Sequence, residues 1–344
     1  MDKEQKIFSE DKSTEMPMQI NPLIIEAYEL LQKAASRTDG ITGLRTGFNK
    51  LDKMTSGWQN GDLIIVGARP SMGKTAFELS MAVNMAVNYR TPVALFSLEM
   101  NNVQLVNRLI VNLCDIPGEK IKNGQLLAYE WQQLDYKLKD LIDAPLYVDD
   151  TAYMKIDDLC DRARKIVQQS GVKIIFIDYL QRIYTEQKYT ENRYSELNYF
   201  TRVLKSLAME LNIPIIVSSQ LNRGVENREG IEGKRPQLID LRDSGTICDD
   251  ADVICFIHRP EYYKIYSDDK GNDLRGVAEI IIAKHRNGAT GDVLLQFNAE
   301  YAKFQDLDNN MAIPMTEGSK LGSNMNNKPI FPEASRDNPF ESGK

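Results

Sequence analysis

The sequence has few of the residues that mark metal sites, disulfide frameworks or membrane spans. Its 344 residues include two histidines and four cysteines, and the cysteines are too far apart for CxxC pairs. A Cys/His metal site is therefore not expected. We expect the cysteines to be reduced, buried thiols instead. No apolar run is long enough for a membrane helix, and the first residues, MDKEQKIFSEDKSTEMPMQ, lack the apolar segment of a secretory signal. These absences predict a cytoplasmic protein. The cysteines are Cys114, Cys160, Cys248 and Cys255.

The chain also lacks an excess of positive charge. Lysine and arginine number 42 against 49 aspartates and glutamates, a net charge of −7. A protein with this balance does not attract nucleic acid over its whole surface, so any nucleic-acid site must be local. A hydrophobic content of 42% with 26% charged residues is typical of a globular domain with a sizeable core.

The composition divides the chain into four parts. We expect a disordered polar N-terminus over 1–20, a linker helix over 21–37, a main domain over 38–307 and a disordered tail over 308–344. Apolar residues recur at helical spacing in the linker helix and leave charges on its other face. This stripe could be buried against the body of the same chain or against the next subunit of an assembly. The stripe consists of Leu23, Ala27, Leu30, Leu31 and Ala34.

Short apolar runs alternate with longer helical patterns through the main domain. Near-continuous apolar strands separated by helices predict an α/β fold, with a mainly parallel sheet flanked by helices on both faces. One such helix is expected over 193–212. The last two runs are separated only by KHRNGAT and predict a C-terminal β-hairpin. The runs are DLIIVG, PVALFS, LYVD, KIIFID, PIIVSS, DVICFI, VAEIIIA and GDVLLQF.

A phosphate-binding loop is the strongest functional signal. In DLIIVGARPSMGKTAFELSMAVNMA an apolar strand runs through a loop of small residues into a helix. Backbone amides at the helix start would meet phosphate oxygens, Lys74 would reach the β- and γ-phosphates, and the Thr75 hydroxyl would bind Mg²⁺. Ala68 stands where the strict pattern has glycine, which requires a negative φ at that position. The predicted nucleotide cradle is Ala68, Arg69, Pro70, Ser71, Met72, Gly73, Lys74, Thr75 and Ala76.

Three polar residues follow other predicted strands at their carboxyl ends, where an open α/β sheet binds its ligand. Asp178 suits the carboxylate that supports Mg²⁺, and Glu99 suits a general base that activates water. Gln220 is an uncharged amide able to sense the γ-phosphate. Asp178 or Glu99 alone would also fit a helix cap or a solvated strand end, but their combination with the loop favours catalysis.

With these elements in place, the chain resembles the C-terminal motor domain of DnaB-type replicative DNA helicases from about Gly43 to Phe304. This resemblance implies a RecA-like P-loop NTPase core that binds ATP and Mg²⁺. It also implies a hexameric ring that moves 5′ to 3′ on single-stranded DNA and unwinds duplex. The matching stretches are TGFNKLDKMTSGWQNGDLIIVGARPSMGKT, FSLEM, IDYLQ, SSQLNR, LRDSGTICDDADVICFIHR and AEIIIAKHRNGATGDVLLQF.

The resemblance also implies roles for individual residues. Glu99 becomes the catalytic base, Asp178 the strand-end carboxylate, and Gln220 the link between nucleotide state and the DNA loops. Lys284 and Arg286 become cations offered to the γ-phosphate of the neighbouring subunit, with a solvated hairpin edge as the alternative interpretation of KHR. His285, between them, is expected to have no role.

For DNA, the resemblance implies central-channel loops over 182–195 and 222–244. Arg242, Asp243 and Gly245 would contact phosphates, Gly245 through its backbone amide. The second loop is as rich in acidic as in basic residues, so without the resemblance a solvated interdomain loop would be the preferred interpretation.

The chain departs from this family at its front, where the helical N-terminal collar is absent. Primase docking and the action of a helicase loader, which the family associates with the collar and linker, are therefore in doubt. A natural short form and a truncation both remain open. Two competing functions remain as well. One is a RecA-type recombination or regulatory ATPase that does not unwind DNA, and the other is a nucleotide-bound scaffold whose tail recruits replication proteins.

Overall fold

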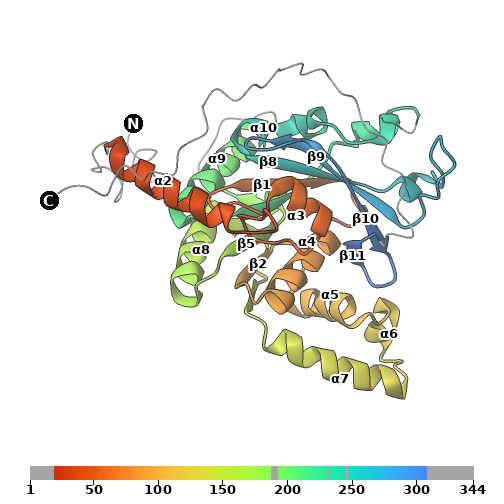
Figure 1. Ribbon diagram of the computed structural model, residues 1–344. Coiled ribbons are helices and arrows are strands. Elements are labelled where there is room, and N and C mark those ends of the chain that lie inside the picture. The colour runs from red at the N-terminus through yellow and green to blue at the C-terminus, as the bar shows by residue number, and fades with distance from the viewer. Residues whose placement is uncertain (1–18, 187–192, 231, 245–246, 308–344) are drawn as a thin grey trace. The chain divides into compact units, whose positions relative to one another are not determined.

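The computed structural model describes residues 19–186, 193–230, 232–244 and 247–307 (Figure 1). A single sheet of nine strands organises this part of the chain, in the order β11-β10-β9-β8-β1-β7-β5-β2-β3. The strands from β8 to β3 run parallel, and β9, β10 and β11 extend the sheet with antiparallel pairings. The strands are β1 Leu63–Ala68, β2 Val93–Ser97, β3 Leu146–Asp149, β5 Ile174–Asp178, β7 Ile215–Gln220, β8 Val253–His258, β9 Val277–His285, β10 Gly291–Asn298 and β11 Lys303–Asp306.

Helices cover both faces of the sheet because its central strands are apolar on both sides. In β1, Ile64 and Val66 join one core cluster with Phe77 of α4 (Lys74–Val83), whereas Leu63 and Ile65 join a second cluster on the other face. Alternation of side chains along a strand places these two sets on opposite faces. The first cluster lies against α4 and α5 (Asn102–Cys114), and the second against α8 (Ile156–Ser170) and α9 (Arg193–Leu211). The α/β fold with a mainly parallel sheet is therefore confirmed.

The helices follow the expected alternation with the strands. The predicted helix over 193–212 is α9, and the predicted hairpin is formed by β9 and β10. The helices are α2 Ile20–Ala35, α3 Asn49–Thr55, α4 Lys74–Val83, α5 Asn102–Cys114, α6 Gly118–Asn123, α7 Ala128–Ile142, α8 Ile156–Ser170, α9 Arg193–Leu211 and α10 Ile247–Asp250, with a π-helical turn at Asn84–Asn88. No helix in the described ranges is long and apolar enough to span a membrane.

The sequence did not predict two elements of β-structure. One is β11, whose residues KFQD are mostly polar and which pairs with β10 at the sheet edge. The other is a separate two-stranded sheet formed by β4 (Met154–Lys155) and β6 (Ile183–Tyr184). Strands this short have too few side chains to form a readable pattern.

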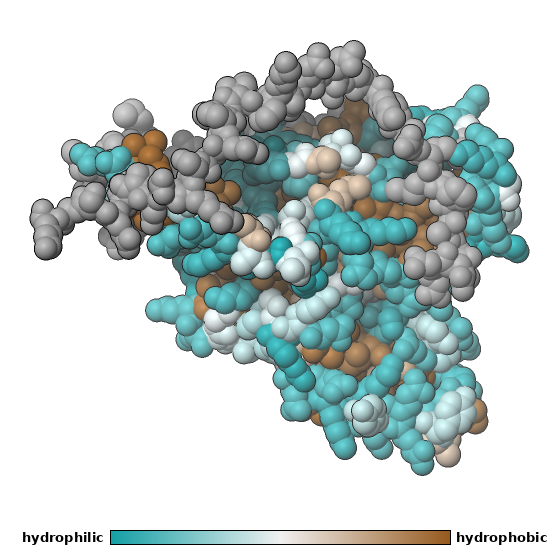
Figure 2. All heavy atoms as spheres, in the orientation of Figure 1, coloured by the Kyte–Doolittle hydropathy of each residue, from teal (hydrophilic) through white to brown (hydrophobic). Residues whose placement is uncertain are grey.

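Helix α2 has no buried residue. Four side chains of its predicted apolar stripe are exposed, with Leu30 at 59% and Leu31 at 67% of full exposure, and Ala34 is half-buried. In Figure 2, apolar side chains accordingly show at the surface along this helix. Within the part of the chain that the structure describes, the body of the domain therefore does not cover this stripe.

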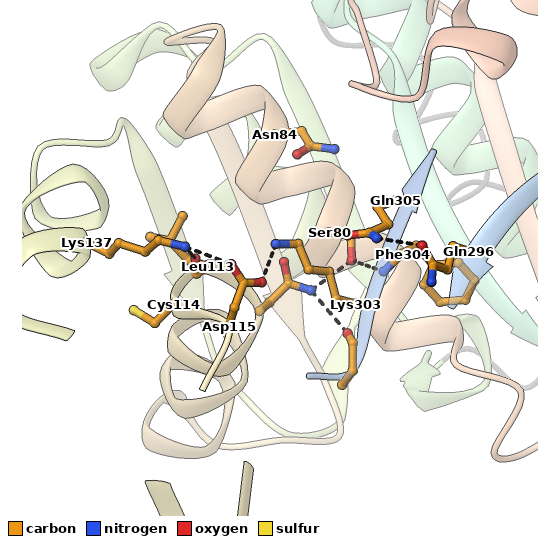
Figure 3. A network of polar contacts seen from close by, with 12 residues as sticks. Ser80, Asn84, Leu113, Cys114, Asp115, Lys137, Gln296, Lys303, Phe304 and Gln305 are labelled. Atoms are coloured by element: carbon orange, nitrogen blue, oxygen red, sulfur yellow. Dashed lines mark hydrogen bonds and ion pairs between the residues drawn. The ribbon is translucent and has the colours of Figure 1, made fainter. Parts of the chain in front are cut away.

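A network of polar contacts ties α4, α5, α7 and the C-terminal strand together (Figure 3). The buried Asn112 amide of α5 donates to Ser80 Oγ of α4 at 2.8 Å and to the Ala302 carbonyl at 3.1 Å. Close by, Asp115 accepts hydrogen bonds from Lys137 Nζ at 2.8 Å and Lys303 Nζ at 2.6 Å. The helix that begins at the phosphate loop is therefore anchored at its far end to β11 through Ser80, which also accepts the Phe304 amide.

The four cysteines are unpaired. Three of them are buried, and Cys248 is half-buried. Burial raises the pKa of the Cys114 thiol to about 11 and that of Cys160 to about 12. The buried cysteines therefore behave as small apolar side chains.

Candidate functional site

The phosphate loop connects β1 to α4 at the carboxyl edge of the sheet. Ala68 is the last residue of β1 and is not among the residues with positive φ, so alanine is tolerated there. Gly73, which precedes α4, has φ +96°, and a Cβ would lie 3.1 Å from the Phe304 ring. Both the backbone conformation and the packing therefore require glycine at this position. Gly73 provides no side-chain cap for α4, so the first amides of this helix have no side-chain acceptor at the cap.

Asp178 and Thr75 meet in front of this loop. The Thr75 hydroxyl donates to Asp178 Oδ2 at 2.6 Å, although 103 residues separate them in sequence. The Lys74 ammonium lies 3.6 Å from Asp178 Oδ1 and 4.3 Å from the centre of the Tyr179 ring. Ser218 of β7 donates to Asp178 Oδ1 at 2.7 Å and thereby fixes the orientation of the carboxylate.

Glu78, one turn into α4, is a buried carboxyl group close to this cluster. Burial raises its pKa well above the usual range, and the nearby charge of Asp178 raises it further, while Lys74 and Ser218 act in the opposite direction. Its Oε1 has no hydrogen-bond partner. Burial therefore favours the protonated form of Glu78. The sequence did not predict this group, because helical periodicity alone does not distinguish a buried glutamate from an exposed one.

Glu99 and Gln220 lie at the same edge of the sheet as Asp178. Glu99 follows β2, where Ser97 is in register with Asp178 on the neighbouring strand. Its carboxylate is half-exposed, and its Oε1 lies 4.0 Å from Arg182 Nη2. Gln220 ends β7 in register with Ala68, and its backbone amide donates to the side chain of Gln181.

Arg182 is a cation beside the predicted catalytic base that sequence reasoning missed. Its guanidinium lies 4.5 Å from the centre of the Tyr153 ring, and its Nε donates to the Tyr179 hydroxyl at 3.2 Å. The hydrogen bond to Tyr179 raises the pKa of Arg182 further, so the group stays charged.

Arg69 was predicted within the nucleotide cradle, but its side chain turns away from Lys74 and Thr75. The guanidinium is buried and donates to the Leu221 carbonyl at 2.8 Å and to Glu226 Oε1 at 2.7 and 3.0 Å. A phosphate could thus be reached only by the backbone of Arg69. On the other side of the loop, Arg259 donates to the Ser71 carbonyl at 3.3 Å and stacks on Phe297 at 3.9 Å.

Lys284 and Arg286 lie at the opposite edge of the sheet from the phosphate loop. Because β9 runs antiparallel to β8, Lys284 is in register with Ile254 near the start of β8, whereas the loop follows the end of β1. Along the strand direction, the register places Lys284 about 10 Å and Arg286 about 17 Å from the end of β1. Both side chains donate to the carbonyl of Asp249, and Arg286 Nε lies 3.6 Å from Asp252 Oδ1. Burial, followed by the charge of Arg286, lowers the pKa of Lys284.

The structure describes the predicted DNA contacts only in part. Arg242 and Asp243 belong to a 3₁₀ segment, Leu238–Ser244, of which the backbone is described. Gly245 lies outside the described residues, as do 187–192 of the first predicted loop. The roles of these residues in DNA binding remain predictions.

The residues at the carboxyl edge suit a magnesium nucleotide. The start of α4 offers backbone N–H groups to anionic oxygens, and Lys74 adds a positive charge. Thr75 and Asp178 supply hard oxygen ligands 2.6 Å apart, and Mg²⁺ commonly takes one or two protein oxygens and completes its shell with phosphate and water. A bound Mg²⁺ would supply charge neutralisation for phosphoryl transfer.

Comparisons with known proteins point the same way. The profile of the DnaB-like helicase C terminal domain matches residues 43–306. Replicative DNA helicase DnaC of Bacillus subtilis (strain 168) is 41% identical over 297 residues, which are 86% of this chain and 64% of that protein. Replicative DNA helicase DnaB of Geobacillus stearothermophilus is 41% identical over 289 residues, 84% of this chain and 62% of that protein. The chain thus spans less than two thirds of the length of these relatives.

Solved structures agree with the sequence comparison. The ATPase domain of G40P superposes with a TM-score of 0.77 at 35% identity, covering 85% of this chain and 100% of that chain. A DnaB-like replicative helicase, described with its interactions with primase, superposes with a TM-score of 0.74 at 35% identity, covering 86% of this chain and 68% of that chain. The nine-stranded sheet, the phosphate loop and these matches together show that the chain belongs to the family of DnaB-like helicase C-terminal domains.

Proposed function

We propose that this chain is the ATP-hydrolysing motor of a ring-shaped DNA helicase, which moves on single-stranded DNA and separates duplex. One observation carries the proposal. The phosphate loop with Asp178 and the cations Lys284 and Arg286 lie at opposite edges of one sheet. Neither cation can serve the nucleotide of its own chain, but both can serve that of an adjacent copy. Such a site is complete only in an assembly, and six copies closing a ring is the arrangement that the resemblance implies.

ATP and Mg²⁺ are the proposed ligands at the carboxyl edge. Lys74 would hold the β- and γ-phosphates, Thr75 and Asp178 would hold Mg²⁺, and Glu99 would accept a proton from the attacking water. In this arrangement Ser218 keeps the Asp178 carboxylate turned toward the metal position. A cation supplied in trans generally raises the rate of phosphoryl transfer by about 10³ to 10⁵, and it makes hydrolysis depend on assembly.

Helix α2 supports the assembly part of the proposal. The described residues of its own domain leave its apolar stripe uncovered, which favours burial against a neighbouring subunit over burial within the chain. DNA would bind along the segments that follow β5 and β7, since these strands carry Asp178 and Gln220 and thus adjoin the nucleotide. One structural relative is known with its primase interactions. Primase and a loader are therefore included as partners to be tested by co-elution with this chain.

The proposal is tested by measuring ATP hydrolysis with and without single-stranded DNA on protein sized by light scattering. We expect a hexamer, stimulation by DNA, dependence on Mg²⁺, and loss of hydrolysis in Lys74→Ala. Unwinding is measured in parallel on a forked duplex with either a 5′ or a 3′ tail. Filaments with strand exchange but no unwinding would favour a recombination ATPase, and a protein that binds nucleotide without turnover would favour a scaffold.

Mixed rings test the trans cation directly. Lys74→Ala removes the phosphate contact but leaves the cations intact, whereas Arg286→Ala does the reverse. Each variant alone should be inactive, but about a quarter of the interfaces in a random equal mixture join an intact loop to an intact cation. Hydrolysis should therefore reappear on mixing. Arg275→Gln, which removes an exposed cation paired with Asp273, is the matched control and should remain active. An active Arg286→Ala ring would rule out the assignment.

A further inference from the structure

The segment 222–244 is bonded to the phosphate loop through one buried arginine. Arg69 has 5% of its side chain exposed and donates from Nε and Nη2 to the same carboxylate oxygen of Glu226, at 3.0 and 2.7 Å. Its Nη1 donates to the Leu221 carbonyl, and the Leu221 amide in turn donates to the Ala68 carbonyl. Arg69 thus joins the first residues of the phosphate loop to the beginning of this segment, across 157 residues of sequence.

Hydrogen bonds and an ion pair also join residues within the segment, so a displacement of Glu226 would displace its neighbours as well. Lys234 Nζ donates to the Glu226 carbonyl at 2.6 Å. Arg228 pairs with Asp240 at 2.5 Å, and the Asn222 amide donates to the Asp240 carbonyl at 3.1 Å. These contacts join the beginning, middle and end of the segment.

The middle of the segment is attached, through Arg235, to the hairpin that carries the trans cations. Arg235 Nη2 lies 2.5 Å from Asp292 of β10, and Arg235 Nε lies 3.0 Å from Glu279 of β9. The segment therefore spans the interval between the phosphate loop and the strand that bears Lys284. A shift of the loop relative to β9 must be taken up by this segment.

We propose that Glu226 is a positioning residue that transmits the state of the phosphate loop to the segment 222–244. The inference rests on the proposed function, in which this segment binds DNA, and it adds a second connection beside Gln220. The physical basis is the burial of Arg69. A desolvated guanidinium keeps its acceptors, because losing one would leave a buried charge poorly paired. When nucleotide draws the loop to a new position, Arg69 therefore takes Glu226 with it.

The predicted quantity is a coupling between two binding events. Single-stranded DNA should bind with different affinities when the protein holds a non-hydrolysable ATP analogue and when it holds ADP. The ratio of the two dissociation constants measures the coupling, and such ratios commonly lie between about 5 and 150. Linkage requires that DNA change the relative affinity for the two nucleotides by the same factor, which gives an independent check.

The test compares Glu226→Gln with the wild type, using the same magnesium nucleotides and the same labelled oligonucleotide. Glu226→Gln keeps the size of the side chain but removes the charge that holds Arg69. We expect the ratio to fall about five-fold or more toward one, and the reciprocal ratio to fall equally. Damage to folding or a general loss of DNA affinity would lower both affinities and leave the ratio as it was. Glu226→Asp retains the carboxylate and should restore part of the ratio.

Glu119→Gln is the matched control, because Glu119 is an exposed glutamate on α6, outside both the segment 222–244 and the phosphate loop. It should keep the wild-type ratio. A Glu226→Gln protein with an unchanged ratio would overturn the inference while leaving the motor intact. A wild-type protein that binds DNA equally well in both nucleotide states would instead overturn the DNA part of the proposed function, and this inference with it.

Discussion

Glu279 makes the stability of the sheet depend on pH, and the sign of that dependence follows from its surroundings. The side chain lies on β9 with 17% of its surface exposed, 3.0 Å from Arg235 Nε. Burial raises the pKa of Glu279 from 4.5 to about 7, with the nearby Arg235 opposing the rise and Asp292 adding to it. The short distance to Arg235 alone would suggest a lowered pKa. However, Glu279 Oε2 and Arg235 Nε lack hydrogen-bond geometry, so burial dominates.

The raised pKa means that the folded protein keeps this proton over a range in which the unfolded chain releases it. Below pH 4.5 both states are protonated and the stabilisation is fully present. It is lost as the pH rises through about 7, above which both states are ionised. One pKa unit corresponds to about 1.4 kcal/mol, so the free energy of unfolding should fall by about 2.5 kcal/mol between pH 5 and pH 8 from this group alone.

Urea denaturation of the wild type and Glu279→Gln at pH 5 and pH 8 isolates this contribution, because all other titrating groups are shared. At equal protein concentration, we expect the two proteins to differ little at pH 5. At pH 8 we expect the variant to be the more stable by about 2 to 3 kcal/mol. The exposed Asp269→Asn should show no such change. If the difference between wild type and Glu279→Gln is the same at both pH values, burial does not control this carboxyl group.

Three further outcomes are expected. Asn112→Ala, which leaves buried groups of the network in Figure 3 without their donor, should lower the free energy of unfolding by about 2 kcal/mol, and an unchanged melting curve would contradict this. Arg182→Leu removes the cation that lies 4.0 Å from Glu99 and should raise the rate of basal ATP hydrolysis. The increase should be at most about five-fold, because such an ion pair is worth about 1 kcal/mol. A lower rate would show that Arg182 assists the base. Leu31→Glu places a charge on the uncovered stripe of α2 and should lower the mass measured by light scattering, unless α2 has no part in assembly.

The sequence predicted the fold well because the central strands are continuous apolar runs. All eight expected runs are strands of the sheet, since a strand buried on both faces tolerates few polar residues. The phosphate loop could be predicted equally well, because its chemistry depends on a short contiguous stretch of residues. By contrast, β11 escaped prediction because its four residues pair at the sheet edge and only Phe304 among them is buried.

Contacts between distant segments could not be read in the same way. Nothing in the local sequence of Arg69 indicates that Glu226 is its partner, and the cation beside Glu99 comes from a turn 83 positions later along the chain. These pairings follow from the strand order β1-β7-β5-β2, which brings the ends of four strands together. Sequence periodicity specifies which face of a strand is buried but not which strands are neighbours.

The position of Lys284 and Arg286 shows how topology bears on a functional question that residue types leave open. The motif KHR fits a solvated hairpin edge as well as a pair of catalytic cations. Because β9 is antiparallel to β8, the hairpin delivers both cations to the amino edge of the parallel strands, away from the phosphate loop of the same chain. Had β9 joined the sheet in parallel, its carboxyl end would have lain beside that loop, and a single subunit could have completed its own site. The direction of one strand therefore separates an enzyme that can act alone from one that requires a neighbour, and the mixed rings of Lys74→Ala and Arg286→Ala measure that difference.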